Sequence, residues 1–257
     1  MASKVEAQTP LQIPRILCLH GGGTNARIFR AQCRVLEAQL KGKFRLCYAE
    51  GPFPSQAGPD VVSVYGEWGP FKRWIRWMPG HPEIDDQTVV EQIKESVYAA
   101  MDEDNRRGAT GEWVGLLGFS QGAKICASLL FSQQIRAEKW GRVNAGSNFR
   151  FAALLAGSAP IISFEPELFM TATFAKASDL STLPSLDDEM IQRNECLLRL
   201  PTIHVHGMRD PGIVRHRNLL KCCAKDSVRV IEWDGDHRVP IKSKDVAALI
   251  EQMLIII

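Results

Sequence analysis

The segment GFSQG, at residues 118–122, places a serine between two glycines in the pattern G-x-S-x-G. In this pattern the serine occupies a strained turn between a strand and a helix, and the glycines leave room for both elements. An apolar run precedes Ser120 and a helical pattern follows it. Free N–H groups at the start of that helix favour developing negative charge. We therefore expect Ser120 to be a nucleophile that attacks a carbonyl carbon.

A serine hydroxyl needs a base, and the chain offers six histidines. In this arrangement the acid and then the base follow the serine along the chain. His237, in the turn-rich segment WDGDHRVP, satisfies this order, and Asp210, in HVHGMRDPG, is expected to orient its imidazole. Asp234 and Asp236 are too close to His237 in sequence and are expected to form the turn. His216, between two arginines, is expected on a solvated helix face.

Three glycines follow the first apolar run in ILCLHGGGTNA, at residues 16–26. Acyl transfer needs two N–H donors for the oxyanion, one from the residue after the nucleophile and one from the loop after the first strand. The sequence predicts Gln121 and Gly22 for these positions and leaves Gly23 open as the alternative to Gly22. His20 is then expected to be structural, with its ring hydrogen-bonded inside the loop.

The same glycines also fit a dinucleotide-binding fingerprint. Gly21, Gly23 and Ala26 match G-x-G-x-x-G/A, and Glu50 ends the next apolar run, near where an acid would bind a ribose. This hypothesis of an oxidoreductase gives no role to the serine, the acid and the base. A third hypothesis is a non-catalytic protein that keeps a hydrolase pocket, and the complete set of three residues argues against it.

Apolar runs that indicate strands alternate with helical patterns almost throughout the chain. The strands are expected at 14–20, 43–49, 112–119, 150–156, 201–206 and 227–233, and the helices at 25–40, 85–104, 121–135, 212–224 and 241–256. This alternation predicts an α/β fold, with a mostly parallel six-stranded sheet and helices on both faces. We expect one domain over residues 1–257, with a flexible N-terminal segment at 1–13 and lid-like insertions at 50–82 and 161–198.

The first of these insertions is rich in aromatic and basic side chains. Its aromatic residues are expected to wall an apolar acyl pocket: Tyr65, Trp68, Phe71, Trp74 and Trp77. Its basic residues are candidates to face an acidic carrier protein: Lys72, Arg73 and Arg76. The alternative is an ordinary amphipathic helix over residues 70–78, which would gather Phe71, Trp74, Ile75 and Met78 on its packed face.

The composition excludes several classes of protein. A formal net charge of +2 and the lack of any long basic run argue against binding to nucleic acid or to a membrane surface. The N-terminus MASKVEAQTPLQIP lacks a signal-peptide core, and no apolar stretch approaches the length of a membrane helix, so we expect a cytoplasmic protein. The seven cysteines are odd in number and scattered, which predicts neither a disulfide framework nor a metal site, and no cofactor is expected.

In this order and spacing, LCLHGGGTNARIF, GFSQG, HVHGMRDPG and GDHRVP resemble the FSH family of serine hydrolases, which are α/β-hydrolases. The segments YAEGPFPSQAGP and GPFKRWIRW resemble its fungal branch, which includes the lovastatin-pathway thioesterase and esterases of polyketide gene clusters. The resemblance covers residues 14–250 and implies a nucleophile, acid and base at Ser120, Asp210 and His237. It also implies hydrolysis of an ester or thioester of an apolar acyl group, in polyketide release or trimming. The implied partners are a small-molecule acyl ester or thioester and the acyl carrier domain of a polyketide synthase.

Overall fold

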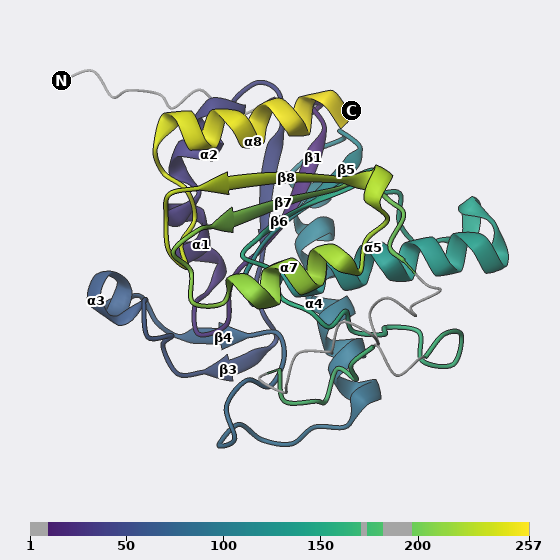
Figure 1. Cartoon of the computed structure of the whole chain (residues 1–257). Helices are drawn as coiled ribbons and strands as arrows, with labels where there is room; N and C mark the ends of the chain where they lie inside the picture. Colours follow the sequence, from purple (N-terminus) through teal and green to yellow (C-terminus); the bar gives the residue numbers. More distant parts are fainter. Residues whose placement is uncertain (1–9, 171–173, 182–196, 257) are drawn as a thin grey trace.

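The computed structural model describes residues 10–170, 174–181 and 197–256. Its central strands are β1 (Arg15–Leu19), β2 (Arg45–Ala49), β5 (Trp113–Phe119), β6 (Phe151–Leu155), β7 (Thr202–Gly207) and β8 (Val228–Trp233). They form one parallel sheet in the order β2-β1-β5-β6-β7-β8 (Figure 1). The predicted six-stranded α/β architecture is confirmed. Because every strand runs the same way, the loops that follow the strands all meet at one edge of the sheet.

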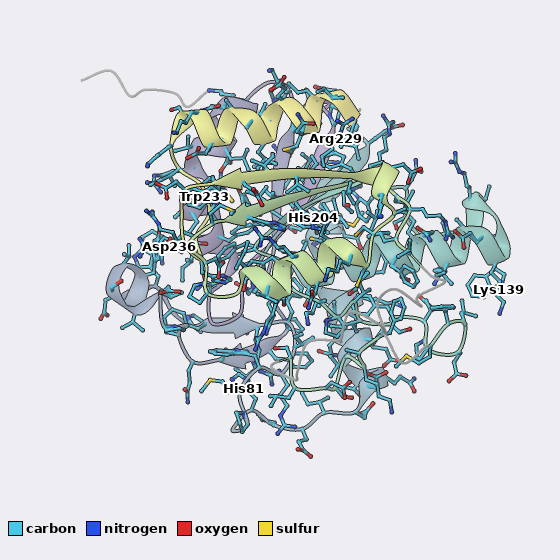
Figure 2. The ribbon with its side chains drawn as sticks, viewed as in Figure 1. His81, Lys139, His204, Arg229, Trp233 and Asp236 are labelled. Atoms are coloured by element: carbon cyan, nitrogen blue, oxygen red, sulfur yellow. The ribbon has the colours of Figure 1, made fainter. Side chains whose placement is uncertain are left out.

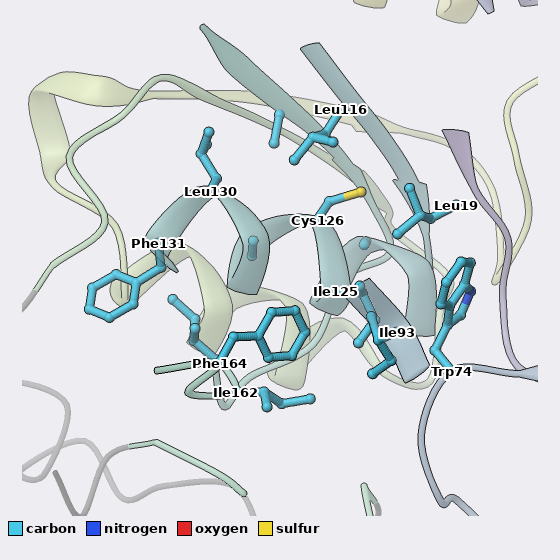
Figure 3. Packing of buried hydrophobic residues seen from close by; sticks show 14 of the residues in the cluster. Leu19, Trp74, Ile93, Leu116, Ile125, Cys126, Leu130, Phe131, Ile162 and Phe164 are labelled. Carbon is cyan, nitrogen blue, oxygen red and sulfur yellow. The ribbon is translucent and has the colours of Figure 1, made fainter. Parts of the chain in front are cut away.

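Helices cover both faces of the sheet. One face carries α1 (Ala26–Gln32), α2 (Arg34–Leu40) and α8 (Ser243–Ile256), and the other carries α4 (Asp86–Arg106), α5 (Gln121–Trp140) and α7 (Ile213–Lys221) (Figure 1). Side chains of β1 alternate between the two cores: Ile16 and Cys18 pack on the first face, and Leu17 and Leu19 on the second. Both faces of the inner strands are buried, which is why β5 and β6 are apolar throughout, whereas the edge strand β8 carries Arg229 and Glu232. Figure 3 shows part of the second core, around α5.

The helix expected over residues 25–40 is divided in two at Cys33, which ends α1 and precedes α2. Its predicted start is confirmed, because the Asn25 side chain accepts a hydrogen bond from the Ile28 N–H at 2.8 Å. The helix predicted at 85–104 is confirmed as α4, and Asp85 caps it by accepting from the Thr88 N–H at 2.8 Å.

The insertion at 50–82 contains its own small antiparallel sheet of β3 (Phe53–Ser55) and β4 (Phe71–Arg73), with the short helix α3 (Val62–Tyr65) between them. The alternative of a helix over 70–78 is therefore wrong. The middle of β4 also pairs with the glycine loop, because the Lys72 N–H donates to the Thr24 carbonyl at 2.6 Å. Pairing with two distant segments outweighs the local helical spacing of the apolar residues. Short 3-10 helices lie at Gly66–Trp68, Arg142–Asn144 and Lys225–Ser227.

Parts of other predicted segments lie outside the described residues, namely 1–9 of the N-terminal segment and 171–173 and 182–196 of the second insertion. Residue Leu11 is anchored, since its carbonyl accepts from the Thr110 N–H at 2.8 Å. The single domain and the flexible N-terminus stay predictions.

None of the helices in the described ranges has the length and apolar character needed to cross a membrane. Six cysteines of the described part, Cys18, Cys33, Cys47, Cys126, Cys222 and Cys223, are buried as free thiols. Cys196 lies outside the described residues. A cytoplasmic location stays a prediction.

Candidate active site

Ser120 lies in the turn between β5 and α5, in the backbone conformation that the motif predicts. Its φ of 54° and ψ of −114° place a non-glycine residue in a sparsely populated region, which is a source of local strain. Gly118 must lack a side chain, because a Cβ there would lie 2.4 Å from the Gly122 carbonyl oxygen. A Cβ on Gly122 would lie 2.1 Å from the Leu19 carbonyl oxygen. The two glycines therefore let helix and strand approach closely enough to hold the serine in this turn.

The loops after β7 and β8 bring Asp210 and His237 to Ser120. The Ser120 hydroxyl lies 2.9 Å from His237 Nε2, and His237 Nδ1 lies 2.7 Å from Asp210 Oδ2. These distances form a continuous hydrogen-bond chain from serine to carboxylate. The structure thus assembles the three residues predicted from sequence. Asp234 and Asp236 lie outside this chain, and their carboxylates contact the exposed arginines Arg209 and Arg238.

The carboxylate of Asp210 is buried and accepts three hydrogen bonds. Oδ2 accepts from His237 and also lies 2.9 Å from His216 Nε2, while Oδ1 accepts from the Gly212 N–H at 2.7 Å. Burial alone would raise the pKa of Asp210. The hydrogen bond from His237, together with those from Gly212 and His216, outweighs burial and holds this pKa well below its usual range. Asp210 therefore stays ionised beside the imidazole.

His216 does not lie on a solvated face, and that expectation is wrong. Its side chain is 3% exposed, and Nδ1 lies 2.9 Å from the Gly157 carbonyl oxygen. The ring is stacked on that of His237 with centroids 6.0 Å apart. Each nitrogen of His216 therefore lies at hydrogen-bond distance from an oxygen atom. The arginines on either side are exposed, and the helical spacing of His216 and the buried Leu219 is the signal that would have placed this histidine inward.

The N–H groups of Gly22 and Gly23, the two candidates in the glycine loop, differ in their hydrogen bonding. The Gly23 N–H donates to the Lys72 carbonyl at 2.9 Å, so it points away from the site. In the described part of the chain, neither the Gly22 N–H nor the Gln121 N–H has an acceptor. Both residues line the same cavity as Ser120. This geometry favours Gly22 over Gly23 as the partner of Gln121.

His20 is a structural residue in the glycine loop, as expected. Its Nε2 accepts from the Gly51 N–H at 2.8 Å, and its Nδ1 lies 2.7 Å from the Gly21 carbonyl oxygen. Glu50 accepts from the Ala26 N–H at 3.2 Å, at the start of α1. A carboxylate of the chain itself therefore occupies the helix N-terminus at which the dinucleotide hypothesis would place a pyrophosphate.

A cavity of about 730 Å³ opens over Ser120. Segment 58–65 of the first insertion and Trp77 line it, so this insertion walls the site as predicted. Among the five predicted aromatic wall residues, Tyr65 and Trp77 line the cavity. Trp74 does not: it is fully buried in the second core, and its Nε1 donates to the His20 carbonyl at 2.8 Å (Figure 3).

Trp68, Phe71 and Arg73 do not take the places predicted for them in the wall or on the basic surface. Trp68 packs against the guanidinium of Arg27, 4.2 Å from its ring centre, and Phe71 belongs to β4. Arg73 is buried over the Phe53 ring, so it cannot face a carrier protein. The other two basic residues are partly exposed, and Arg76 contacts Glu83 at 2.7 Å.

One group of side chains in the described residues has the spacing of metal ligands. Ligand atoms of Asp210, His216 and His237 lie within 4.8 Å of one another. Each imidazole, however, places a ring nitrogen at hydrogen-bond distance from the same carboxylate oxygen, Oδ2. Hydrogen bonding therefore accounts for the close approach of these three side chains. The expectation that the protein holds no metal stays a prediction.

Comparison with known proteins identifies the family. Residues 9–249 match the family described as serine hydrolase (FSH1). The chain belongs to this family. A probable esterase, tazC, from Aspergillus terreus is 54% identical over 242 residues, which cover 94% of this chain and 91% of that protein. Esterase pigG from Monascus ruber is 54% identical over 258 residues, covering 98% and 94%.

Solved structures share the fold of this FSH1 serine hydrolase. Acyl-protein thioesterase 2 from Zea mays has a TM-score of 0.54 at 15% identity and covers 95% of this chain and 94% of its own. A carboxylesterase from Mesorhizobium loti has a TM-score of 0.52 at 17% identity, covering 95% and 89%. At such low identity these likenesses show the fold alone, which is that of the α/β-hydrolases. The family resemblance and the hydrolase class predicted from sequence are confirmed, and the oxidoreductase hypothesis is wrong.

Proposed function

We propose that this serine hydrolase cleaves an ester or thioester of an apolar acyl group, with Ser120 as nucleophile, His237 as base and Asp210 as acid. The observation that carries the proposal is the hydrogen-bond chain from Ser120 through His237 to Asp210, which ends at a carboxylate that stays ionised. It supplies a hydroxyl, a proton acceptor and a fixed negative charge in the order that acyl transfer needs.

The reaction begins when the Ser120 oxygen attacks the carbonyl carbon and its proton passes to His237 Nε2. The carbonyl oxygen becomes an oxyanion and accepts hydrogen bonds from the N–H groups of Gly22 and Gln121. When the tetrahedral intermediate collapses, the alcohol or thiol leaves with the proton from His237, and the acyl group stays on Ser120. A water molecule then gives its proton to His237 and attacks the acyl-enzyme. The acid is released and the serine regains its hydrogen.

The apolar acyl group is supported by the cavity and by the relatives. Tyr65 and Trp77 line the cavity, and several relatives from fungi are described as esterases. We assign the protein to the release or trimming of a polyketide in fungal secondary metabolism, as the sequence resemblance implies. Its substrate is a small ester or the thioester of an acyl carrier domain.

A fluorophosphonate probe tests the nucleophile. The wild-type protein should be labelled, and Ser120→Ala should lose the label and at least about 10³-fold in ester hydrolysis. Ser158 lines the same cavity, so Ser158→Ala is the matched control and should be labelled like the wild type. Undiminished labelling of folded Ser120→Ala would refute the assignment. Labelling of Ser120 without turnover of any ester or thioester would favour the non-catalytic alternative.

The leaving group is tested with paired substrates. Esters and N-acetylcysteamine thioesters of the same acyl groups, compared across chain lengths, report the preference directly. A kcat/KM for thioesters at least tenfold above that for the matched esters supports the carrier-bound substrate. The reverse preference supports a small ester.

A further inference from the structure

Lys124 is a cation buried beside the nucleophile. It lies in the first turn of α5, and its backbone N–H donates to the Ser120 carbonyl at 3.2 Å. The residue is only 2% exposed, yet it lines the same cavity as Ser120 and His237. The side chain of Lys124 is therefore enclosed by the protein beside the cavity that contains Ser120.

The ammonium of Lys124 has three hydrogens to donate and one acceptor in the described part of the chain, the Ala159 carbonyl at 3.3 Å. No carboxylate in the described ranges pairs with it. Burial, together with the positive charge of Arg215, lowers the pKa of Lys124 to about 8. A buried cation that lacks a counter-charge costs free energy in the empty site, and an anion that enters the cavity would remove that cost.

Two arginines around the cavity differ from Lys124 in this respect. Arg209 lies 3.0 Å from Asp234, and Arg238 lies 3.3 Å from Asp236, and both arginine side chains are largely exposed. Their charges are balanced by the chain and screened by solvent. Lys124 has no such carboxylate partner in the described part of the chain and is buried, so its charge is available to a charged group on a ligand.

We propose that Lys124 binds a carboxylate on the acyl group of the substrate, at the end away from the bond that is cleaved. The inference rests on the proposed hydrolysis at Ser120. An anion that reaches so enclosed an ammonium must be compact, which fits a carboxylate better than a bulky group held at the rim. Tyr65 and Trp77 then contact the apolar part of the chain, and Arg215, which also lines the cavity, adds positive charge. Lys124 acts in specificity and takes no part in proton transfer.

Matched substrates test this assignment. One series is the p-nitrophenyl monoesters of linear dicarboxylic acids of about six to ten carbons, and the other is the same compounds with the free acid methylated. The wild-type enzyme should have a higher kcat/KM for the charged ester at one or more lengths. Lys124→Met keeps the length and apolar stem of the side chain, and should lose about tenfold to hundredfold in kcat/KM on the charged ester, through KM. On the neutral ester it should stay within about twofold of the wild type.

The control is Lys139→Met, an exposed lysine near the far end of the same helix, which should leave both series unchanged (Figure 2). Equal losses on both series, or no loss, would overturn the proposal. If Lys124→Met does not fold, Lys124→Gln is compared with the wild type in its place. A wild-type preference for the neutral ester at every length also overturns the proposal. Failure of the proposed function is distinct, because the wild type would then hydrolyse neither series.

Discussion

Replacing His216 by phenylalanine tests how the Asp210 carboxylate is held. The change keeps a ring of similar size in a buried position but removes both of its hydrogen bonds, one to Asp210 and one to the Gly157 carbonyl, each 2.9 Å long. Two donors remain on Asp210, the Gly212 N–H and His237 Nδ1, both at 2.7 Å. The Asp210 carboxylate therefore loses one of its three hydrogen bonds and is still held by the other two.

The size of the effect follows from these contacts. A hydrogen bond to a charged group contributes about 1.5–3 kcal/mol, which corresponds to about 10- to 150-fold if all of it acts on the transition state. Because two donors remain, we expect His216→Phe to lower kcat about tenfold and to leave KM unchanged. Removing the acid with Asp210→Ala should cost about 10⁴-fold. The Gly157 carbonyl loses its buried partner, so the free energy of unfolding should also fall by about 1–3 kcal/mol.

Steady-state hydrolysis of a p-nitrophenyl ester, together with urea unfolding, separates the two consequences. His216→Gln is the second variant, because its amide can still donate to Asp210 and should recover part of kcat. A folded His216→Phe enzyme with wild-type kcat would refute the argument that His216 positions the acid. A loss of kcat as large as that of Asp210→Ala would also refute the argument, because the two remaining donors would then not keep the Asp210 carboxylate in place.

Two further predictions concern the turn and the core. Gly122→Ala places a Cβ 2.1 Å from the backbone oxygen of Leu19, so it should lower the free energy of unfolding by about 3 kcal/mol or more. In the control Gly80→Ala the new Cβ meets nothing within 4 Å, so the free energy of unfolding should change by less than about 0.5 kcal/mol. Similar urea midpoints for the two variants would contradict the close approach of helix and strand. Burial lowers the pKa of His204, labelled in Figure 2, to about 3, so the folded protein keeps it neutral while the unfolded chain takes up a proton below about pH 6.5. The free energy of unfolding should therefore fall as the pH drops below 6.5, up to about 1.4 kcal/mol per pH unit more steeply in the wild type than in His204→Val. Parallel curves of unfolding free energy for the two proteins from pH 7 to 5 would contradict this prediction.

The sequence by itself determined the hydrolase family and which three residues to propose for the central site. The pattern G-x-S-x-G between an apolar run and a helical pattern identified Ser120, and the chain order of acid and base identified Asp210 and His237. The three residues lie together in the structure because the parallel sheet places successive loops at one edge, so order along the chain becomes proximity in space. The alternation of strands and helices specified the architecture for the same reason.

Tertiary structure decided which groups around that site are available. Gly22 and Gly23 are adjacent and chemically identical, and only the pairing of Gly23 with Lys72, nearly fifty residues away, occupies one of their N–H groups. His216 lies between arginines in sequence, and only the packing of α7 brings it to Asp210. Periodicity reports which residues are apolar, but it does not report which distant backbone a polar group will meet. The partners of a buried donor or charge are set by long-range packing, which is why the sequence could predict Ser120, Asp210 and His237 and only the structure shows their neighbours.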